Sequence, residues 1–204
     1  MRRWEPSLNR KICSVLIVII VVAILGTWYF YAYPNHQAMD DGFEEGSGGW
    51  VADADVPADP NKPGHLVAWN ITRTTYVANS GRYSLKFFID GVQDDGTLWI
   101  ENKISVRNKA RIQVKVSFEL YSEHESFNAI ADVCAYAGLR NPEVEGDFTV
   151  LGPANEIAGW KKYTYTTILD VGSSDEVWFA VGITVRWETR MTYYIDDVEI
   201  EVRW

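Results

Sequence analysis

Two runs of acidic residues are the first candidates for chemistry in this chain of 204 residues. Glu119, Glu123 and Glu125 surround His124, and a pair of carboxylates at a set separation is what glycoside hydrolysis requires. Glu119 falls on the polar face of a predicted strand, whereas Glu123 and Glu125 fall in the following turn, which is typical of a solvated hairpin tip. A second run follows Pro142 in a predicted loop: Glu143, Glu145 and Asp147. With no nucleophile elbow, phosphate loop or zinc signature in the sequence, we expect a protein without enzymatic activity.

Aromatic side chains are the second candidate, because a pyranose ring presents apolar faces that stack on exposed rings. The chain contains nine tryptophans and eleven tyrosines. Tyr121 falls on the polar face of its predicted strand, and Trp178 and Arg186 fall opposite an apolar face, so these polar faces could line one concave sheet. The alternative is that half of the rings are ordinary core residues or cover sheet edges. The candidate ligand-binding residues are Trp69, Trp99, Tyr121, Tyr136, Trp178, Arg186 and Trp187.

One triplet, Asn70-Ile71-Thr72, matches the Asn-x-Ser/Thr signal for glycosylation. In an exported domain we expect Asn70 to be able to carry a glycan, although such triplets also arise by chance.

The elements that would position these residues are strands. Between Arg111 and Tyr121 apolar side chains alternate with polar ones, which predicts a half-buried strand. The same alternation runs through 83–89 and 179–185, and further strands are expected near 97–106, 128–138, 160–169 and 192–203. The proline-rich stretch 52–64 is expected to be a surface loop. Many short strands at regular spacing predict an all-β, antiparallel jelly-roll sandwich over residues 40–204.

Residues 12–33 form an uncharged stretch that, as a helix, would extend about 33 Å, the thickness of a bilayer's hydrocarbon core. Four basic residues precede it and an aromatic cluster ends it before Pro34. The pattern predicts a basic cytoplasmic tail (1–11), a single-pass transmembrane signal-anchor helix (12–33) and a tether (34–39). The predicted location is the cell membrane, with the N-terminus cytoplasmic and the domain extracytoplasmic. The alternative, a cleaved signal peptide, would also place the domain outside.

The net charge limits the possible partners. The chain carries −9 overall, and because its first eleven residues carry +3, the remainder carries −12. Such an acidic domain argues against nucleic acid as a partner. Of the two cysteines, Cys13 lies in the predicted membrane segment and Cys134 in the domain, so no disulfide is expected within the domain. Cys134 is expected to be a small buried residue.

Four short segments together resemble a known family. They are 41–50 (DGFEEGSGGW), 80–85 (SGRYSL), 159–164 (GWKKYT) and 194–200 (YIDDVEI). In order and spacing these segments resemble carbohydrate-binding-module-like, galactose-binding-like jelly-roll domains. The resemblance covers nearly all of residues 40–202 and implies the fold, with Trp50 and Trp160 in its core. It does not specify the function, since this scaffold hosts sugar binders, adhesion modules and structural parts.

The resemblance also implies a structural calcium ion between the first and last strands. Alternation in the closing strand places Asp196 on the inward, apolar face, where a carboxylate must be paired or bound to a metal. Oxygen atoms near it would suit calcium, and the expected ligands come from Glu44, Asp196, Asp41, Ser80 and Arg82. The alternative is that Asp196 accepts hydrogen bonds from backbone amides of the adjacent N-terminal loop.

Two functions without catalysis therefore remain open. One is a membrane-anchored carbohydrate-binding module, and the other is an interaction subunit of an envelope or membrane complex. A glycoside-active enzyme on the same scaffold is the less favoured alternative. Rings that line a concave groove would favour sugar, whereas a flat apolar patch or an open strand edge would favour a protein partner.

Overall fold

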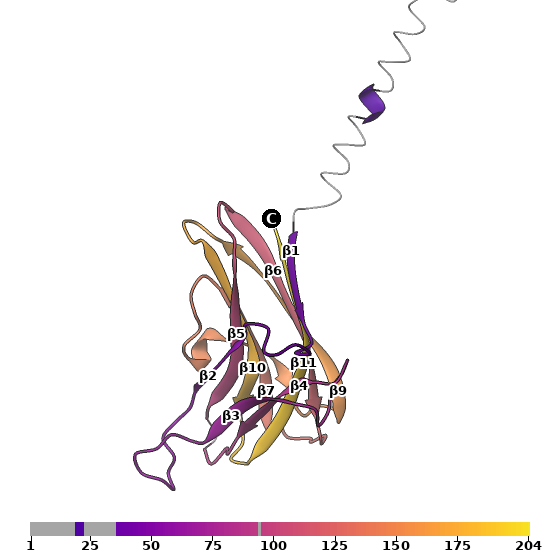
Figure 1. Ribbon diagram of the computed structural model, residues 1–204. Coiled ribbons are helices and arrows are strands. Elements are labelled where there is room, and N and C mark those ends of the chain that lie inside the picture. Colours follow the sequence, from indigo (N-terminus) through magenta and orange to yellow (C-terminus); the bar gives the residue numbers. More distant parts are fainter. Residues whose placement is uncertain (1–18, 23–35, 94) are drawn as a thin grey trace, which may run out of the picture. The chain divides into compact units, whose positions relative to one another are not determined.

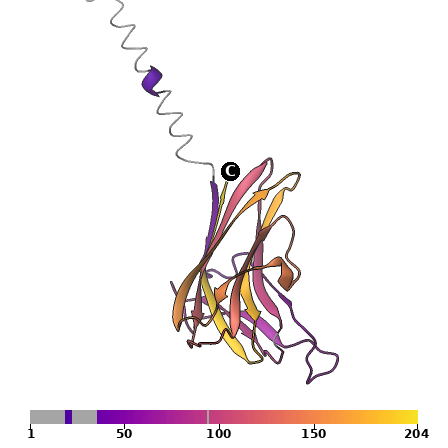
Figure 2. The same ribbon diagram turned by 180° about the vertical axis from the view of Figure 1, so that it is seen from behind.

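The computed structural model describes residues 19–22, 36–93 and 95–204. The chain divides into two units, Met1–His36 and Gln37–Trp204, and the second holds the strands (Figures 1 and 2). The elements are β1 (His36–Asp41), β2 (Val51–Asp55), β3 (Trp69–Thr74), β4 (Ser84–Ile89), β5 (Thr97–Ser105), β6 (Arg111–Ser122), β7 (Ala131–Gly138), the 3-10 helix η1 (Glu145–Asp147), β8 (Thr149–Pro153), β9 (Gly159–Asp170), β10 (Glu176–Val185) and β11 (Met191–Arg203).

The strands form two antiparallel sheets. The six-stranded sheet has the order β3-β4-β11-β6-β9, with β1 paired to β11, and the five-stranded sheet has the order β2-β5-β10-β7-β8. The prediction of an all-β antiparallel sandwich is thus confirmed.

The inner faces of the two sheets form the core. In β6 the alternating residues Ile112, Val114, Val116, Phe118 and Leu120 are all buried. Facing residues of β10 are buried as well, and Trp50 packs edge-on against Phe179 at 5.6 Å between ring centroids. Each fully buried apolar side chain of this size contributes about 1.5–3 kcal/mol to folding, so the alternation seen in the sequence accounts for the stability of the sandwich.

Two segments predicted to lack regular structure are strands. Residues 36–39, assigned from sequence to a tether, belong to β1, and Val51–Asp55, assigned in part to a proline-rich loop, form β2. Both are short strands without a buried residue, and they carry little apolar alternation. Their place is set by backbone pairing with β11 and β5.

The predicted membrane anchor requires correction. Over residues 19–22, 36–93 and 95–204 no helix is long and apolar enough to cross a membrane. A single-pass location at the cell membrane is therefore not supported. The rest of the predicted segment, 12–18 and 23–33, and the tail 1–11 lie outside the described residues.

Candidate functional site

The outer face of the five-stranded sheet carries four of the predicted ligand residues. Strand register places Trp99 of β5, Tyr136 of β7 and Trp178 of β10 on this one face, and Arg186 directly follows β10. They therefore share one sheet face, but the expected sheet that joins Tyr121 with Trp178 and Arg186 does not form. Tyr121 does not join them, because β6 belongs to the other sheet.

The chain itself covers the centre of this face. The connection between β7 and β8, residues 139–148, lies against the outer side of the sheet (Figure 1). Trp99 is fully buried, and its indole Nε1 donates to Glu101 Oε2 at 2.7 Å. The Phe148 ring lies 5.0 Å from that of Trp99 and 6.0 Å from that of Tyr136. Trp99 thus cannot act as an open sugar platform, and this part of the prediction is wrong.

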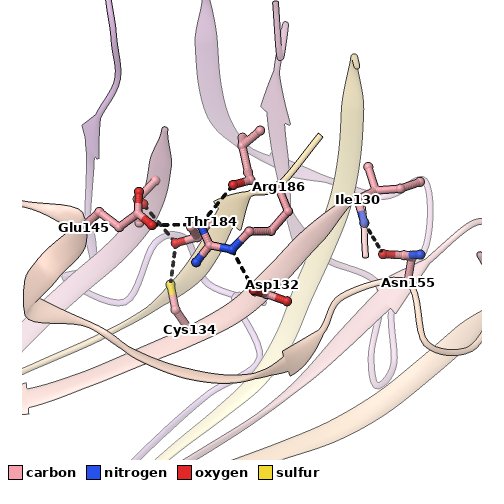
Figure 3. A network of polar contacts seen from close by, with 9 residues as sticks. Ile130, Asp132, Cys134, Glu145, Asn155, Thr184 and Arg186 are labelled. Carbon is pink, nitrogen blue, oxygen red and sulfur yellow. Dashed lines mark hydrogen bonds and ion pairs between the residues drawn. The ribbon is translucent and has the colours of Figure 1, made fainter. Parts of the chain in front are cut away.

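Arg186 holds the covering segment in place. Its Nε donates to Asp132 Oδ2 at 2.8 Å and its Nη1 to Glu145 Oε1 at 2.9 Å (Figure 3). The backbone N–H of Glu145 in turn donates to Asp55 Oδ2 at 3.0 Å. The guanidinium predicted to bind a ligand is therefore engaged within the fold.

Beneath Arg186 lies the free thiol of Cys134. Thr184 Oγ1 is 3.8 Å from its Sγ, and burial raises the pKa of the thiol to about 12. A fully buried thiol of this kind is protonated at neutral pH and unreactive, so Cys134 has a packing role.

A strip of four aromatic rings crosses the outer face of the other, six-stranded sheet. We define the aromatic strip as Tyr76, Tyr194, Tyr121 and Trp160. The strand register sets Tyr194 beside Tyr121 and Tyr121 beside Trp160. The ring centroids lie 5.9 Å apart in the first pair and 5.3 Å in the second, and Tyr76 stacks on Tyr194 at 5.5 Å.

The aromatic strip is partly open to solvent. Tyr76 is 70% exposed, Tyr121 and Trp160 are half-buried, and only Tyr194 is buried beneath its neighbours. The expectation that Trp160 lies in the core is wrong, because its register partner Tyr121 faces outward. Aromatic rings that keep exposed surface can contribute stacking contacts to a pyranose ring.

Polar groups lie beside the aromatic strip. The adjacent register row holds Glu119, Lys162 and Asp196, and burial raises the pKa of Glu119. The hydroxyl of Tyr194 lies 3.4 Å from Glu123 Oε1, and burial is the main cause that raises its pKa to about 12. Of these groups, the Glu119 carboxylate and the Lys162 ammonium could hydrogen-bond the hydroxyl edge of a sugar, whereas Asp196 is fully buried.

The remaining predicted residues lie apart from the aromatic strip. Trp69 of β3 faces inward and packs against the core, so it offers no platform. Trp187 lies in the connection between β10 and β11 and is 59% exposed. Asn70 is exposed on the outward side of β3, and its glycosylation stays a prediction.

Asp196 is fully buried, but on the opposite face from the one predicted. A β-bulge between Asp196 and Glu199, with Asp197 at φ 48°, shifts the register of β11 against β6. Up to the bulge Tyr194 and Asp196 face outward, and beyond it Val198, Ile200 and Val202 are buried in the core. The connection between β3 and β4 covers Asp196 on this outer face.

Backbone amides satisfy the Asp196 carboxylate. Its Oδ2 accepts from the N–H groups of Asn79 at 2.7 Å and Ser80 at 3.2 Å, and its Oδ1 accepts from that of Asp197 at 2.8 Å. The donors come from Asn79 and Ser80 rather than from the N-terminal loop, although Gly42 lies close by. Despite these bonds, burial raises the pKa of Asp196 to about 6.

The other residues of the predicted calcium site are bonded in the same way. Glu44 Oε1 accepts from the N–H groups of Arg82 and Tyr83, both at 2.9 Å, which lowers the pKa of Glu44. Asp41 Oδ1 accepts from Phe43 N–H at 2.8 Å. In the described residues these carboxylates therefore accept hydrogen bonds from backbone N–H groups. No group of three or more His, Cys, Asp or Glu that could hold a metal occurs in the described ranges. Calcium stays a prediction.

The acidic residues considered for hydrolysis are either paired within the fold or exposed in connections. Glu145 pairs with Arg186, and Asp147 pairs with Arg140 and accepts from the N–H of Glu143. Glu123 and Glu125 are exposed in the connection after β6.

Sequence reasoning missed Tyr76, Tyr194 and Trp160. The outward position of Trp160 follows from pairing with Tyr121, a signal that only the register between β6 and β9 supplies. Tyr76 comes from a connection, which no periodicity could place.

Comparisons with known proteins bear on the fold. No protein-family model matches the chain, and no curated protein is similar to it in sequence. A structure from work on carbohydrate-binding modules of the β-sandwich superfamily and their promiscuous specificity is similar, with a TM-score of 0.53 and 15% identity over 81% of this chain and 74% of that one. The K3 adhesin domain of Lys-gingipain from Porphyromonas gingivalis is similar with a TM-score of 0.50 and 13% identity, over 82% and 99%. At such identities the likeness shows a shared fold: this chain has the β-sandwich architecture that carbohydrate-binding modules use.

Proposed function

We propose that the β-sandwich is a non-catalytic carbohydrate-binding module and that the aromatic strip is its sugar platform. The observation that carries this proposal is the row of neighbouring rings on one sheet face. These rings come from the connection between β3 and β4 (Tyr76), from β11 (Tyr194), from β6 (Tyr121) and from β9 (Trp160). The likeness in fold to carbohydrate-binding modules supports it.

The chemistry of the two outer faces favours this location. On the five-stranded sheet the segment 139–148 covers Trp99, whereas on the six-stranded sheet Tyr76, Tyr121 and Trp160 keep exposed surface. Stacking a pyranose on a ring removes apolar surface of both from water, which is favourable by about 25 cal/mol for each Å² buried. Glu119 and Lys162 flank the rings and would hydrogen-bond sugar hydroxyls.

Isothermal titration of the full chain tests this proposal, with cellohexaose, xylohexaose and β-1,4-mannohexaose as probes. We expect at least one to bind, and we expect Trp160→Ala and Tyr121→Ala each to weaken that binding about tenfold, the loss of about 1.4 kcal/mol of stacking. The matched control is Trp187→Ala, which removes an exposed ring away from the aromatic strip and should leave binding unchanged.

Three outcomes would contradict the proposal in different ways. If none of the three sugars binds, the function as a module for β-1,4-linked chains is wrong. If binding persists in Trp160→Ala and Tyr121→Ala but is lost in Trp178→Ala, the site lies on the five-stranded sheet. An equal loss of sugar affinity in Trp187→Ala would show that binding does not depend specifically on the aromatic strip.

A second candidate function is the binding of a protein partner. Phe127, in the connection after β6, is fully exposed, and Trp187, after β10, is 59% exposed. The two connections are joined where Arg186 N–H donates to the Ile130 carbonyl at 2.9 Å. Exposed aromatic rings are enriched in protein interfaces, so a chain that binds no oligosaccharide would favour this function.

A further inference from the structure

Strand β9 is a free edge of the six-stranded sheet. It pairs with β6 over its full twelve residues, Gly159–Asp170, and within the described ranges no strand pairs with its other side. The other edge strands are much shorter: β2 and β8 have five residues each and β3 has six. β9 therefore offers a long row of backbone N–H and C=O groups for pairing.

Unlike two of these edges, β9 carries little that discourages pairing. Natural edge strands are protected by charges, proline or bulges. β2 bears two acidic residues, and β8 contains a bulge in its pairing with β7 and ends at Pro153. β9 has no proline, and its charges are confined to its ends: Lys161 and Lys162 at the start and Asp170 at the finish.

We propose that β9 is a homodimer interface in which a second copy of this chain adds its own β9 antiparallel across a two-fold axis. Thr166 then lies opposite Thr166 of the partner copy. Side chains alternate between the two faces of a strand. An antiparallel pair therefore keeps like faces together only when the numbers of two opposite residues are both even or both odd. The register centred on Thr166 satisfies this condition.

Charge complementarity selects this register. Centred on Thr166, it places Lys162 opposite Asp170 of the second copy, and it does so twice because the axis is two-fold. Shifting the centre by one residue sets Lys162 against Ile168 in one direction and Asp170 against Thr164 in the other. Opposite charges facing across strands stabilise the pairing, whereas these alternatives leave the charges unmatched.

The cross-strand neighbours are also compatible. Thr164 and Ile168, both exposed, would face each other, as would the half-buried Tyr165 and Thr167. Ile168 is 54% exposed in the single chain, and pairing would cover part of its surface. Lys162 and Asp170 now pair with Glu199 at 3.2 Å and Arg111 at 3.6 Å at the surface, where solvent screens such pairs, so both remain available.

A cysteine cross-link tests the register. Directly opposite residues in an antiparallel pair lie about 4.5–5.5 Å apart at Cα, which a disulfide can bridge. In the full chain with Cys13→Ser, we expect Thr166→Cys to form a dimer cross-link under mild oxidation that a reductant reverses. Thr164→Cys, whose expected neighbour is Ile168, is the control and should not cross-link efficiently. Cys134 is fully buried and should not contribute. Equal cross-linking of both variants, or of neither, would overturn the proposal.

A charge exchange tests it independently by sedimentation velocity. We expect the full chain to dimerise, and Lys162→Glu or Asp170→Lys alone to raise the dissociation constant about tenfold, because each places like charges opposite each other. The double variant should restore dimerisation. Lys62→Glu, exposed in the connection between β2 and β3, makes the same charge change as a control. A chain that stays monomeric at all concentrations, or a double variant as weak as the single ones, would contradict this interface.

Discussion

At the scale of single residues, Asp196 shows how one side chain organises distant segments. Its carboxylate accepts three backbone N–H groups, two of them from the connection between β3 and β4. Asp197, next in sequence, accepts from Asn79 Nδ2 at 2.7 Å and Ser80 Oγ at 2.5 Å. The two aspartates thus hold that connection against the bulge of β11, close to where Tyr76 stacks on Tyr194.

Replacement of Asp196 should destabilise the fold. In Asp196→Ala three N–H groups would lose their acceptor, and an unsatisfied buried donor costs about 1–3 kcal/mol. We expect the free energy of unfolding to fall by about 2–4 kcal/mol, measured by urea denaturation. Asp197→Asn is the control, since it keeps a residue suited to positive φ and should cost about 1 kcal/mol or less. An Asp196→Ala chain as stable as the unchanged one would contradict the role assigned to this carboxylate.

Asp196 should also make stability depend on pH. Its pKa is about 6 in the folded chain against 3.8 for an ordinary aspartate, so the folded state holds a proton that the unfolded state has lost between these values. The free energy of unfolding should therefore fall as the pH rises from about 4 to 6, by about 3 kcal/mol at most, and stay level above. Denaturation at several pH values should show this slope, and Asp196→Asn should lack it. Identical slopes would refute the assignment.

At the scale of elements, the connection between β7 and β8 decides what the five-stranded sheet can bind. Phe148 packs on Trp99, the Tyr136 hydroxyl donates to the Arg140 carbonyl at 2.8 Å, and Arg186 bridges Asp132 and Glu145. The segment thus closes a face that its rings would otherwise make available to a sugar.

Removal of the Arg186 bridge should loosen this connection. In Arg186→Met the carboxylates of Asp132 and Glu145 lose their shared cation, and because the pairs are partly exposed we expect a loss of about 1–2 kcal/mol. Hydrogen exchange by mass spectrometry should show faster exchange in 139–148. Arg190→Met, which breaks a pair with Asp90 elsewhere, should leave that segment unchanged. Unaltered exchange of 139–148 in Arg186→Met would show that packing alone holds the segment.

At the scale of the whole sandwich, the two sheets use their inner faces for one core and leave two outer faces and the sheet edges for function. One outer face is covered by 139–148, and the other carries the aromatic strip. The β9 edge lies beside that strip, with Trp160 near its start and the proposed two-fold axis at Thr166. Sugar binding and dimerisation can therefore be tested separately on one sheet.

The sequence by itself determined the strands that have one apolar face. Residues 97–105, 111–122, 159–170 and 191–203 are strands close to the predicted ranges, because alternation between apolar and polar side chains records burial locally. The same pattern placed Phe179, Val181 and Ile183 inward and Trp178 and Arg186 outward, and it left β1, β2, β3 and β8 undetected.

Only the tertiary structure decided which outward residues meet. Alternation identifies two faces of a strand but not what lies over the outer one, which depends on segments far away in sequence. Phe148 covers Trp99 on one sheet. On the other sheet, the segment with Asn79 and Ser80 covers Asp196, and Tyr76 stacks on Tyr194. The bulge after Asp196 moved that carboxylate to the outer face, and strand pairing, not local pattern, set Trp160 beside Tyr121.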